Sequence, residues 1–284
     1  MMKQIPILAI VKQSLAMPFS RPLEIFKALG LFAAAFLFMS LLIAVAMIVS
    51  GDPALFQELG QGGGEPTEAT IEGMAELMLG LAPALLLGLA VMLMVAAHVF
   101  NFWVRAGAFG VENAKFETFG KALSAAGINA LKFFALSLLL GVASFVAFFV
   151  LQALGLSVGF AKQMELAMSN DIAAATKAGL MNQIVMTVVT CGIYSWVSAN
   201  LTQTAVGEDR EGLQHPHVMD FGIVLFLLYV IVLVPQVLLS LTGNPLLMTV
   251  VYWPMLLFIT LAIGVAHGIR YRICMAENEQ KVFE

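Results

Sequence analysis

Pro235 and Gln236 are the two neighbouring residues best placed to do chemistry within an apolar part of this chain. Both lie in a run of mostly apolar residues from 219 to 242. A proline inside a helix removes an amide hydrogen, frees a carbonyl oxygen and bends the helix. The pair could therefore line a polar pathway for a solute, or Gln236 could form a hydrogen bond with a neighbouring helix. We favour the second, structural interpretation.

Two histidines, His98 and His267, lie near the ends of two other apolar segments. Brought together across a helical bundle, they could bind a metal ion or relay a proton. No cysteine or carboxylate accompanies them at ligand spacing, so the metal signal is weak. We expect the two imidazoles to be interfacial and to form hydrogen bonds with backbone or lipid headgroups, and we expect no metal and no cofactor.

Two common catalytic motifs are absent from the chain. It has no Walker loop and no H-E-x-x-H pair. No Asp, Glu, Lys or Arg falls in the central third of any long apolar segment, which argues against an ion-coupled pump. Its two cysteines, Cys191 and Cys274, belong to different segments and predict no disulfide framework. These observations predict a protein that is not an enzyme.

The composition indicates which elements must position these residues. Of 284 residues, 61% are hydrophobic and 11% are charged, whereas soluble domains carry about 25% charged residues. A soluble enzyme is therefore excluded, and no basic, aromatic-rich stripe indicates nucleic-acid binding. A hydrocarbon core about 30 Å thick needs roughly 20 apolar residues in a helix. Six segments reach that length, namely 28–50, 77–101, 127–154, 181–206, 219–242 and 246–269.

The predicted fold class is all-α, a polytopic transmembrane bundle of six spans. The chain divides into three parts, which are a cytoplasmic leader (1–27), a six-span membrane domain (28–269) and a cytoplasmic tail (270–284). In the leader, Ile7, Leu8, Val11 and Leu15 share one helical face. This pattern predicts an amphipathic helix lying in the membrane interface, and a frayed tail is the alternative.

Basic residues predict the orientation of the spans, because cytoplasmic loops are enriched in Lys and Arg. The segment 51–76 contains no Lys or Arg and six acidic residues. With six spans and both termini inside, only Lys162 and Lys177 lie outside, so 12 of the 14 basic residues are cytoplasmic. We therefore expect both termini in the cytoplasm of a bacterial cell, with the spans in its inner membrane.

Two stretches resemble a group of bacterial inner-membrane proteins. One is Ser20-Arg21-Pro22-Leu23 after the amphipathic leader, and the other runs from Arg105-x-x-x-Phe109-Gly110 through Phe116-x-x-Phe119-Gly120-Lys121-Ala122-Leu123. The pattern resembles the glycerophosphoryl diester phosphodiesterase membrane-domain family and its six-helix bacterial relatives. The resemblance covers nearly the whole chain and implies a helical bundle in the inner membrane. In that family the membrane domain is often fused to a soluble phosphodiesterase domain, which these 284 residues do not contain, so we carry over no phosphodiesterase activity from the resemblance.

Two functions remain open at this point. The first is an integral membrane protein without catalytic chemistry that acts through membrane lipids or a membrane-protein partner. The second is a permease-like transporter of a neutral or amphiphilic solute, with a cleft near Pro235 and Gln236. A polar cavity open to one side of the membrane would favour the transporter, and a fully packed bundle would favour the first function.

Overall fold

The computed structural model describes residues 6–50, 68–155, 157–159, 172–207, 217–240 and 245–282, together with Lys162, Glu165 and Met168. In these residues the chain forms eight α-helices and one short 3-10 helix, and it forms no strand. Six of the helices are long and apolar enough to cross a membrane. The all-α class and the six spans predicted from the sequence are therefore confirmed.

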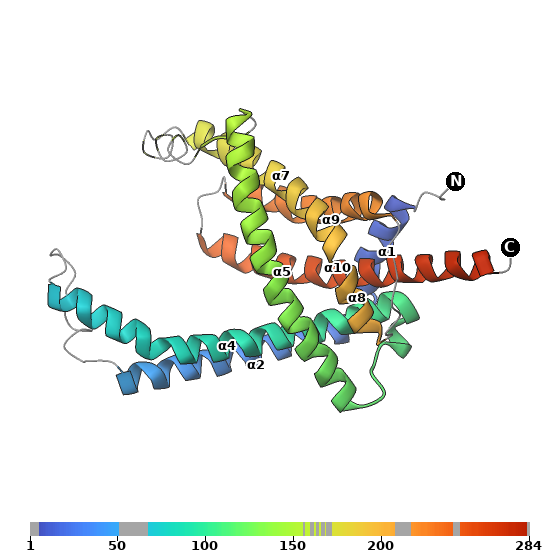
Figure 1. Ribbon diagram of the computed structural model, residues 1–284, viewed down its shortest axis with the longest axis horizontal. Helices are drawn as coiled ribbons and strands as arrows, with labels where there is room; N and C mark the ends of the chain where they lie inside the picture. Colours follow the sequence, from blue (N-terminus) through green and yellow to red (C-terminus); the bar gives the residue numbers. More distant parts are fainter. Residues whose placement is uncertain are drawn as a thin grey trace. The chain divides into compact units, whose positions relative to one another are not determined.

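Figure 1 shows the helices in their order along the chain. Their bounds are α1 (Ile7–Phe19), α2 (Pro22–Ser50), α4 (Glu68–Phe109), η1 (Val111–Asn113), α5 (Phe119–Ala153), α7 (Ile172–Val197), α8 (Ala199–Val206), α9 (Val218–Ser240) and α10 (Pro245–Val282). The 38 residues of α10 extend for about 57 Å, which exceeds the ~30 Å of a hydrocarbon core.

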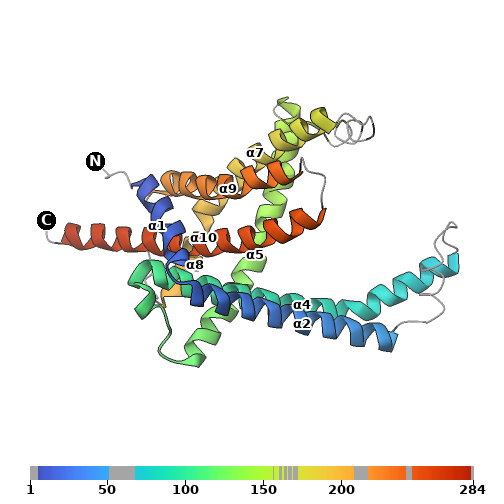
Figure 2. The ribbon, with the colours of Figure 1, turned by 180° about the vertical axis from the view of Figure 1, so that it is seen from behind.

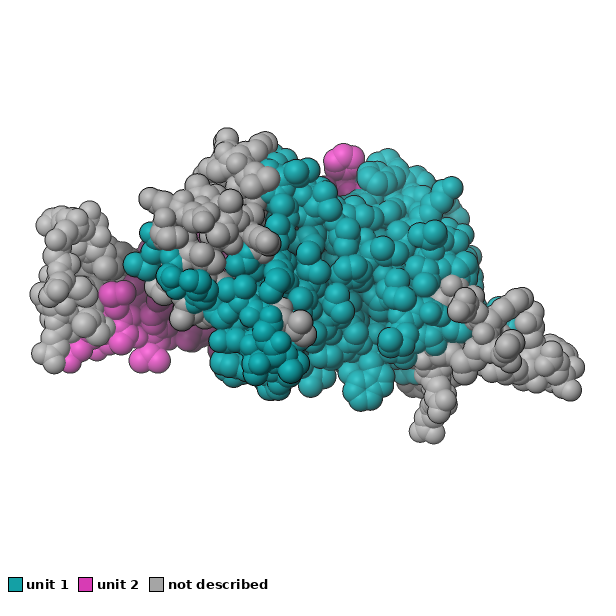
Figure 3. Space-filling model, turned by 90° about the horizontal axis from the view of Figure 1, so that it is seen from above, with its two compact units in different colours: residues 1–22, 98–284 teal, residues 23–97 magenta. Residues whose placement is uncertain are grey.

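Two compact units divide the chain (Figure 3). The smaller unit, residues 23–97, contains nearly all of α2 and the larger part of α4. Within it the two helices come close at Gly88, where an added Cβ would meet the flexible side chain of Met39. The larger unit contains residues 1–22 and 98–284, including the end of α4 from His98 onward.

Helix α10 is the central helix of the larger unit. Every residue from Leu261 to Tyr271 is buried, as expected for a helix enclosed by others on all sides. Helices α1 and α9 pack directly against α10, and α7 packs between α9 and α5 (Figures 1 and 2). The end of α4 crosses α10 at Gly264, where the nearest atoms belong to Trp103 and Phe100.

Helix α1 is the helical leader expected from the sequence, and it is packed on the bundle. Its buried residues are Ile10, Ser14 and Pro18, which repeat every four positions and form one stripe. Helix α1 packs against α9 and α10. The centroid of the Phe19 ring lies 4.3 Å from that of the Phe258 ring on α10. Leu8, on the predicted apolar face, is 76% exposed and is free to contact lipid. The interfacial position of α1 stays a prediction.

Several connections that the predicted topology puts on one side of the membrane do contact one another. Arg21, between α1 and α2, forms a 2.7 Å ion pair with Glu112 in the α4–α5 connection. The same connection is joined to the end of α8, because Arg105 donates hydrogen bonds to the carbonyl oxygens of Ala114 and Val206. These contacts agree with the predicted topology, in which the chain crosses the membrane twice between the two segments of each contact.

Helices extend past several of the predicted spans. Helix α2 begins at Pro22, within the predicted leader. Helix α4 continues to Phe109 and α5 begins at Phe119, with the Thr118 hydroxyl accepting a hydrogen bond from the Lys121 amide. Helix α10 continues through the predicted tail to Val282. Residues 51–67, on which much of the charge argument depends, lie outside the described residues.

Candidate functional site

His267 is the centre of a buried polar cluster in the larger unit. Its side chain is 0% exposed. Nδ1 lies 3.0 Å from the Thr202 hydroxyl on α8, and Nε2 lies 3.2 Å from the Tyr194 hydroxyl on α7. A neutral imidazole has one donor and one acceptor nitrogen, and here both have a hydroxyl within hydrogen-bond distance. The Phe100 and Phe221 rings pack edge-on against the imidazole, with centroid-to-centroid distances of 5.3 and 4.8 Å.

This environment corrects the expectation for His267. The sequence predicted an interfacial imidazole bonded to backbone or lipid headgroups, and the structure gives a fully buried imidazole bonded to two side chains. The reason is that α10 is the central helix, so a residue in its second half is enclosed by α7 and α8. His98 is half-buried on α4. Within the residues described, no group of three or more His, Cys, Asp or Glu side chains could hold a metal ion.

Arg270 belongs to the same buried region, one helical turn after His267. Its side chain is 1% exposed. Nη1 donates a 3.2 Å hydrogen bond to the Ser195 carbonyl oxygen, and the guanidinium carbon lies 4.5 Å from the centroid of the Phe221 ring. The sequence placed Arg270 at the start of the cytoplasmic tail. The three-residue spacing from His267 places both on one face of a helix, which was the available signal.

Two asparagines extend the cluster toward α5. Asn129 Nδ2 donates to Asn101 Oδ1 at 2.5 Å and to the Leu201 carbonyl oxygen at 3.0 Å. Both side chains are 0% exposed. Asn101 Nδ2, Asn129 Oδ1 and the Ser198 hydroxyl have no hydrogen-bond partner among the described residues. Such groups destabilise a buried site by about 1–3 kcal/mol each, so this region is held by the packing around it.

A cavity of about 200 Å³ lies beside this cluster, between the spans. Its apolar walls come from four helices and consist of Phe100, Phe133, Leu140, Leu225 and Ile263. Its polar residues are Thr190, Cys191, Tyr194, Tyr229 and Thr260. The hydroxyls of two of them already have protein partners, since Tyr194 contacts His267 and Thr260 donates to the Leu256 carbonyl oxygen at 2.8 Å. The walls therefore present mostly carbon to an occupant.

Gln236 contacts a neighbouring helix in the structure. Gln183 Nε2 on α7 donates a 3.1 Å hydrogen bond to Gln236 Oε1 on α9. Pro235 lies within α9, whose helix continues past it to Ser240. Neither Pro235 nor Gln236 lines the cavity described above. The contact with Gln183 is the one that the helix-bridging interpretation requires, and a role in a solute pathway stays a prediction.

No family model, curated protein or solved structure matches this chain. The likeness to the glycerophosphoryl diester phosphodiesterase membrane-domain family therefore stays a prediction.

Proposed function

We propose that the chain is an integral protein of a bacterial inner membrane, with both termini in the cytoplasm, and that it acts by binding membrane lipid without catalysing a reaction. The six long apolar helices support the membrane assignment. The distribution of basic residues, with 12 of 14 on one predicted side, supports the orientation.

The cavity between the spans is the observation that carries the lipid proposal. Its volume of about 200 Å³ is below the ~300–1,000 Å³ of a small-molecule site, so it suits part of one acyl chain better than a whole solute. The aromatic and aliphatic walls match a hydrocarbon chain, and the Tyr194 and Thr260 hydroxyls are engaged by the protein. Thr260 is itself exposed, which gives a chain a route into the cavity from the lipid side.

A permease for a neutral or amphiphilic solute is the second candidate. The Gln183–Gln236 pair favours it, because two long polar side chains meet there inside predicted spans. Gln183 and Gln236 are already hydrogen-bonded to each other, so a passing solute would have to compete with that bond. A membrane-protein partner bound on the exposed apolar faces is compatible with either function.

The test fills the cavity and counts the lipids that the protein retains. Thr190→Phe adds a ring to the cavity from α7, and Val188→Phe adds the same ring on the outward face of α7, where Val188 is 52% exposed. Native mass spectrometry of the purified proteins should show one lipid fewer on Thr190→Phe than on Val188→Phe or wild type. Equal lipid counts on both variants would contradict lipid binding in the cavity.

A further inference from the structure

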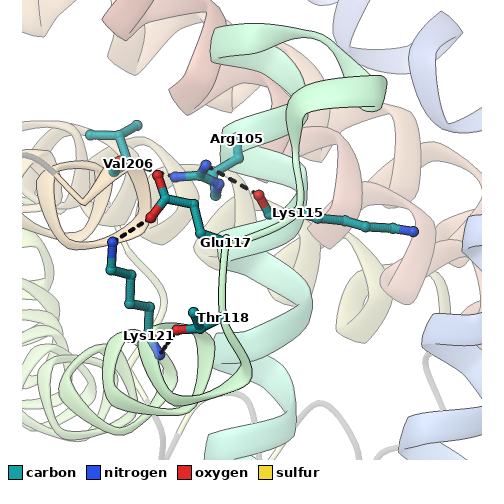
Figure 4. A network of polar contacts seen from close by, with 6 residues as sticks. All are labelled: Arg105, Lys115, Glu117, Thr118, Lys121 and Val206. Carbon is teal, nitrogen blue, oxygen red and sulfur yellow. Dashed lines mark hydrogen bonds and ion pairs between the residues drawn. The ribbon is translucent and has the colours of Figure 1, made fainter.

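A second cavity, of about 500 Å³, lies beside the contact between α5 and α8. Its charged lining residues are Arg105, Glu117 and Lys121, and polar groups of Ser124 and Gln203 complete its wall. The lining residues come from the end of α4, the α4–α5 connection, the start of α5 and the end of α8, and Figure 4 shows Arg105, Glu117 and Lys121 among them. On the predicted topology this is the cytoplasmic end of the bundle, at the level of lipid headgroups.

Arg105 is held in place by neutral acceptors. Its Nε donates to the Ala114 carbonyl oxygen at 2.9 Å, Nη1 to that of Val206 at 3.0 Å, and Nη2 to that of Lys115 at 3.3 Å. The guanidinium carbon lies 4.5 Å from the centroid of the Phe116 ring. Carbonyl oxygens and an aromatic face fix the guanidinium without cancelling its charge, so Arg105 stays an anion-attracting group.

Lys121 adds a second positive charge to the pocket, and the carboxylate of Glu117 neutralises only one of the two charges of Arg105 and Lys121. Lys121 Nζ donates to Glu117 Oε2 at 2.5 Å, and Figure 4 shows the Glu117 carboxylate between Lys121 and Arg105. The two cations and one carboxylate leave a net charge of +1 on the lining residues. Lys121 also lies in the first turn of α5, whose N-terminus carries partial positive charge.

We propose that this pocket binds a phosphate group, with Arg105 and Lys121 as its ligands and with Glu117 as an internal carboxylate that the phosphate displaces. Arginine and lysine together are a common arrangement for phosphate, because a guanidinium offers parallel N–H donors and an ammonium offers a compact charge. The volume of about 500 Å³ accommodates a phosphoester with its polar substituent.

The phosphate could belong to a lipid headgroup or to a soluble phosphoester. Further along the same α5–α8 contact, Leu136, Leu139 and Leu201 line a third cavity together with Lys132. This succession of a cationic pocket and an apolar one suits a phospholipid. The site shares no lining residue with the cavity at Thr190, so it goes beyond the proposed function and does not depend on it.

The experiment uses the full-length protein purified in dodecyl maltoside, a detergent without phosphate, and two kinds of probe. Inorganic phosphate and glycerol 3-phosphate are titrated by calorimetry, and phosphatidylglycerol is added to a second set of micelles in which the melting temperature of the protein is measured. Lys121→Gln should weaken binding about tenfold, because one charge-assisted bond is lost. Glu117→Gln should strengthen it, because the competing carboxylate is gone.

Lys162→Gln is the matched control, since Lys162 forms a comparable exposed pair with Glu165 at 2.8 Å and lies outside the pocket. Circular dichroism checks that each variant is folded. Binding of the soluble probes, lost in Lys121→Gln, supports a soluble phosphoester. Stabilisation by phosphatidylglycerol alone, lost in the same variant, supports a lipid headgroup. Absence of both effects, or equal effects of Lys121→Gln and Lys162→Gln, overturns the proposal, whatever the Thr190→Phe result.

Discussion

Gly107 on α4 and Gly268 on α10 lie at a backbone-to-backbone crossing of the two helices. A Cβ built on Gly268 would overlap the Val104 carbonyl oxygen, and one built on Gly107 would overlap the Val265 carbonyl oxygen. Gly264 and Gly268 form a G-x-x-x-G pair, the spacing that lets two helices approach closely within a membrane. This crossing brings Phe100 and His267 together, since each lies within one or two turns of it.

Gly268→Ala should therefore destabilise the protein strongly. The new methyl group would meet backbone atoms of α4, which cannot move aside as a side chain can, so we expect a loss of about 1–3 kcal/mol or more. Gly141→Ala in α5 is the control, because a Cβ there meets nothing within 4 Å. Thermal unfolding of the purified proteins should show a lower melting temperature for Gly268→Ala and an unchanged or higher one for Gly141→Ala. Equal melting temperatures would mean that the helices are not in backbone contact.

Gln236→Leu should cost about 1 kcal/mol or less, the usual strength of a hydrogen bond between transmembrane helices. Gln183→Leu should have a similar effect, and the double variant should cost less than the sum of the two, because both remove the same 3.1 Å bond. Unfolding in detergent, with and without added solutes, measures all three variants. A wild-type protein that a solute stabilises, together with a Gln236→Leu variant that it does not, would favour the permease function instead.

Glu117 should titrate below its ordinary pKa of 4.5. The hydrogen bond and charge of Lys121, together with the charge of Arg105, hold the pKa of this carboxyl down. A lowered folded-state pKa means that the ion pair stabilises the connection above about pH 4.5 and loses this effect as the pH falls through the folded value. Carboxyl carbon NMR of the protein should show this low titration, and Lys121→Gln should move it upward. An unchanged value in Lys121→Gln would show that the pair does not form.

Cysteine labelling in intact cells should show the predicted orientation. In a background without Cys191 and Cys274, cysteines at Gly63 and Ser169 should react with a membrane-impermeant thiol reagent, and one at Gly212 should not. All three positions lie outside the described residues, and the prediction depends on the charge bias alone. Labelling at Gly212 only would reverse the orientation.

The sequence predicted the six helices because each span requires about 20 apolar residues, and such runs are visible without a structure. The sequence could not predict that α10 is the central helix, because hydropathy measures the affinity of a segment for lipid. Hydropathy does not show which helices surround a given helix. Arg270 illustrates this limit, since a basic residue after an apolar run is typical of a cytoplasmic tail, yet its side chain is 1% exposed. The Thr202–His267 contact joins residues 65 positions apart and leaves no local pattern. Gly264 and Gly268 were a visible signal for the α4–α10 crossing.

Photocrosslinking would detect an acyl chain in the cavity between the spans. The protein is reconstituted with a phospholipid that carries a diazirine in its acyl chain, irradiated, and mapped by peptide mass spectrometry. We expect adducts on cavity residues such as Phe133, Leu225 and Ile263 as well as on outward residues such as Leu238 and Val146. Leu225 is the decisive position, because it lines the cavity and its side chain is 1% exposed. Adducts confined to the outward residues would show that no acyl chain enters the cavity.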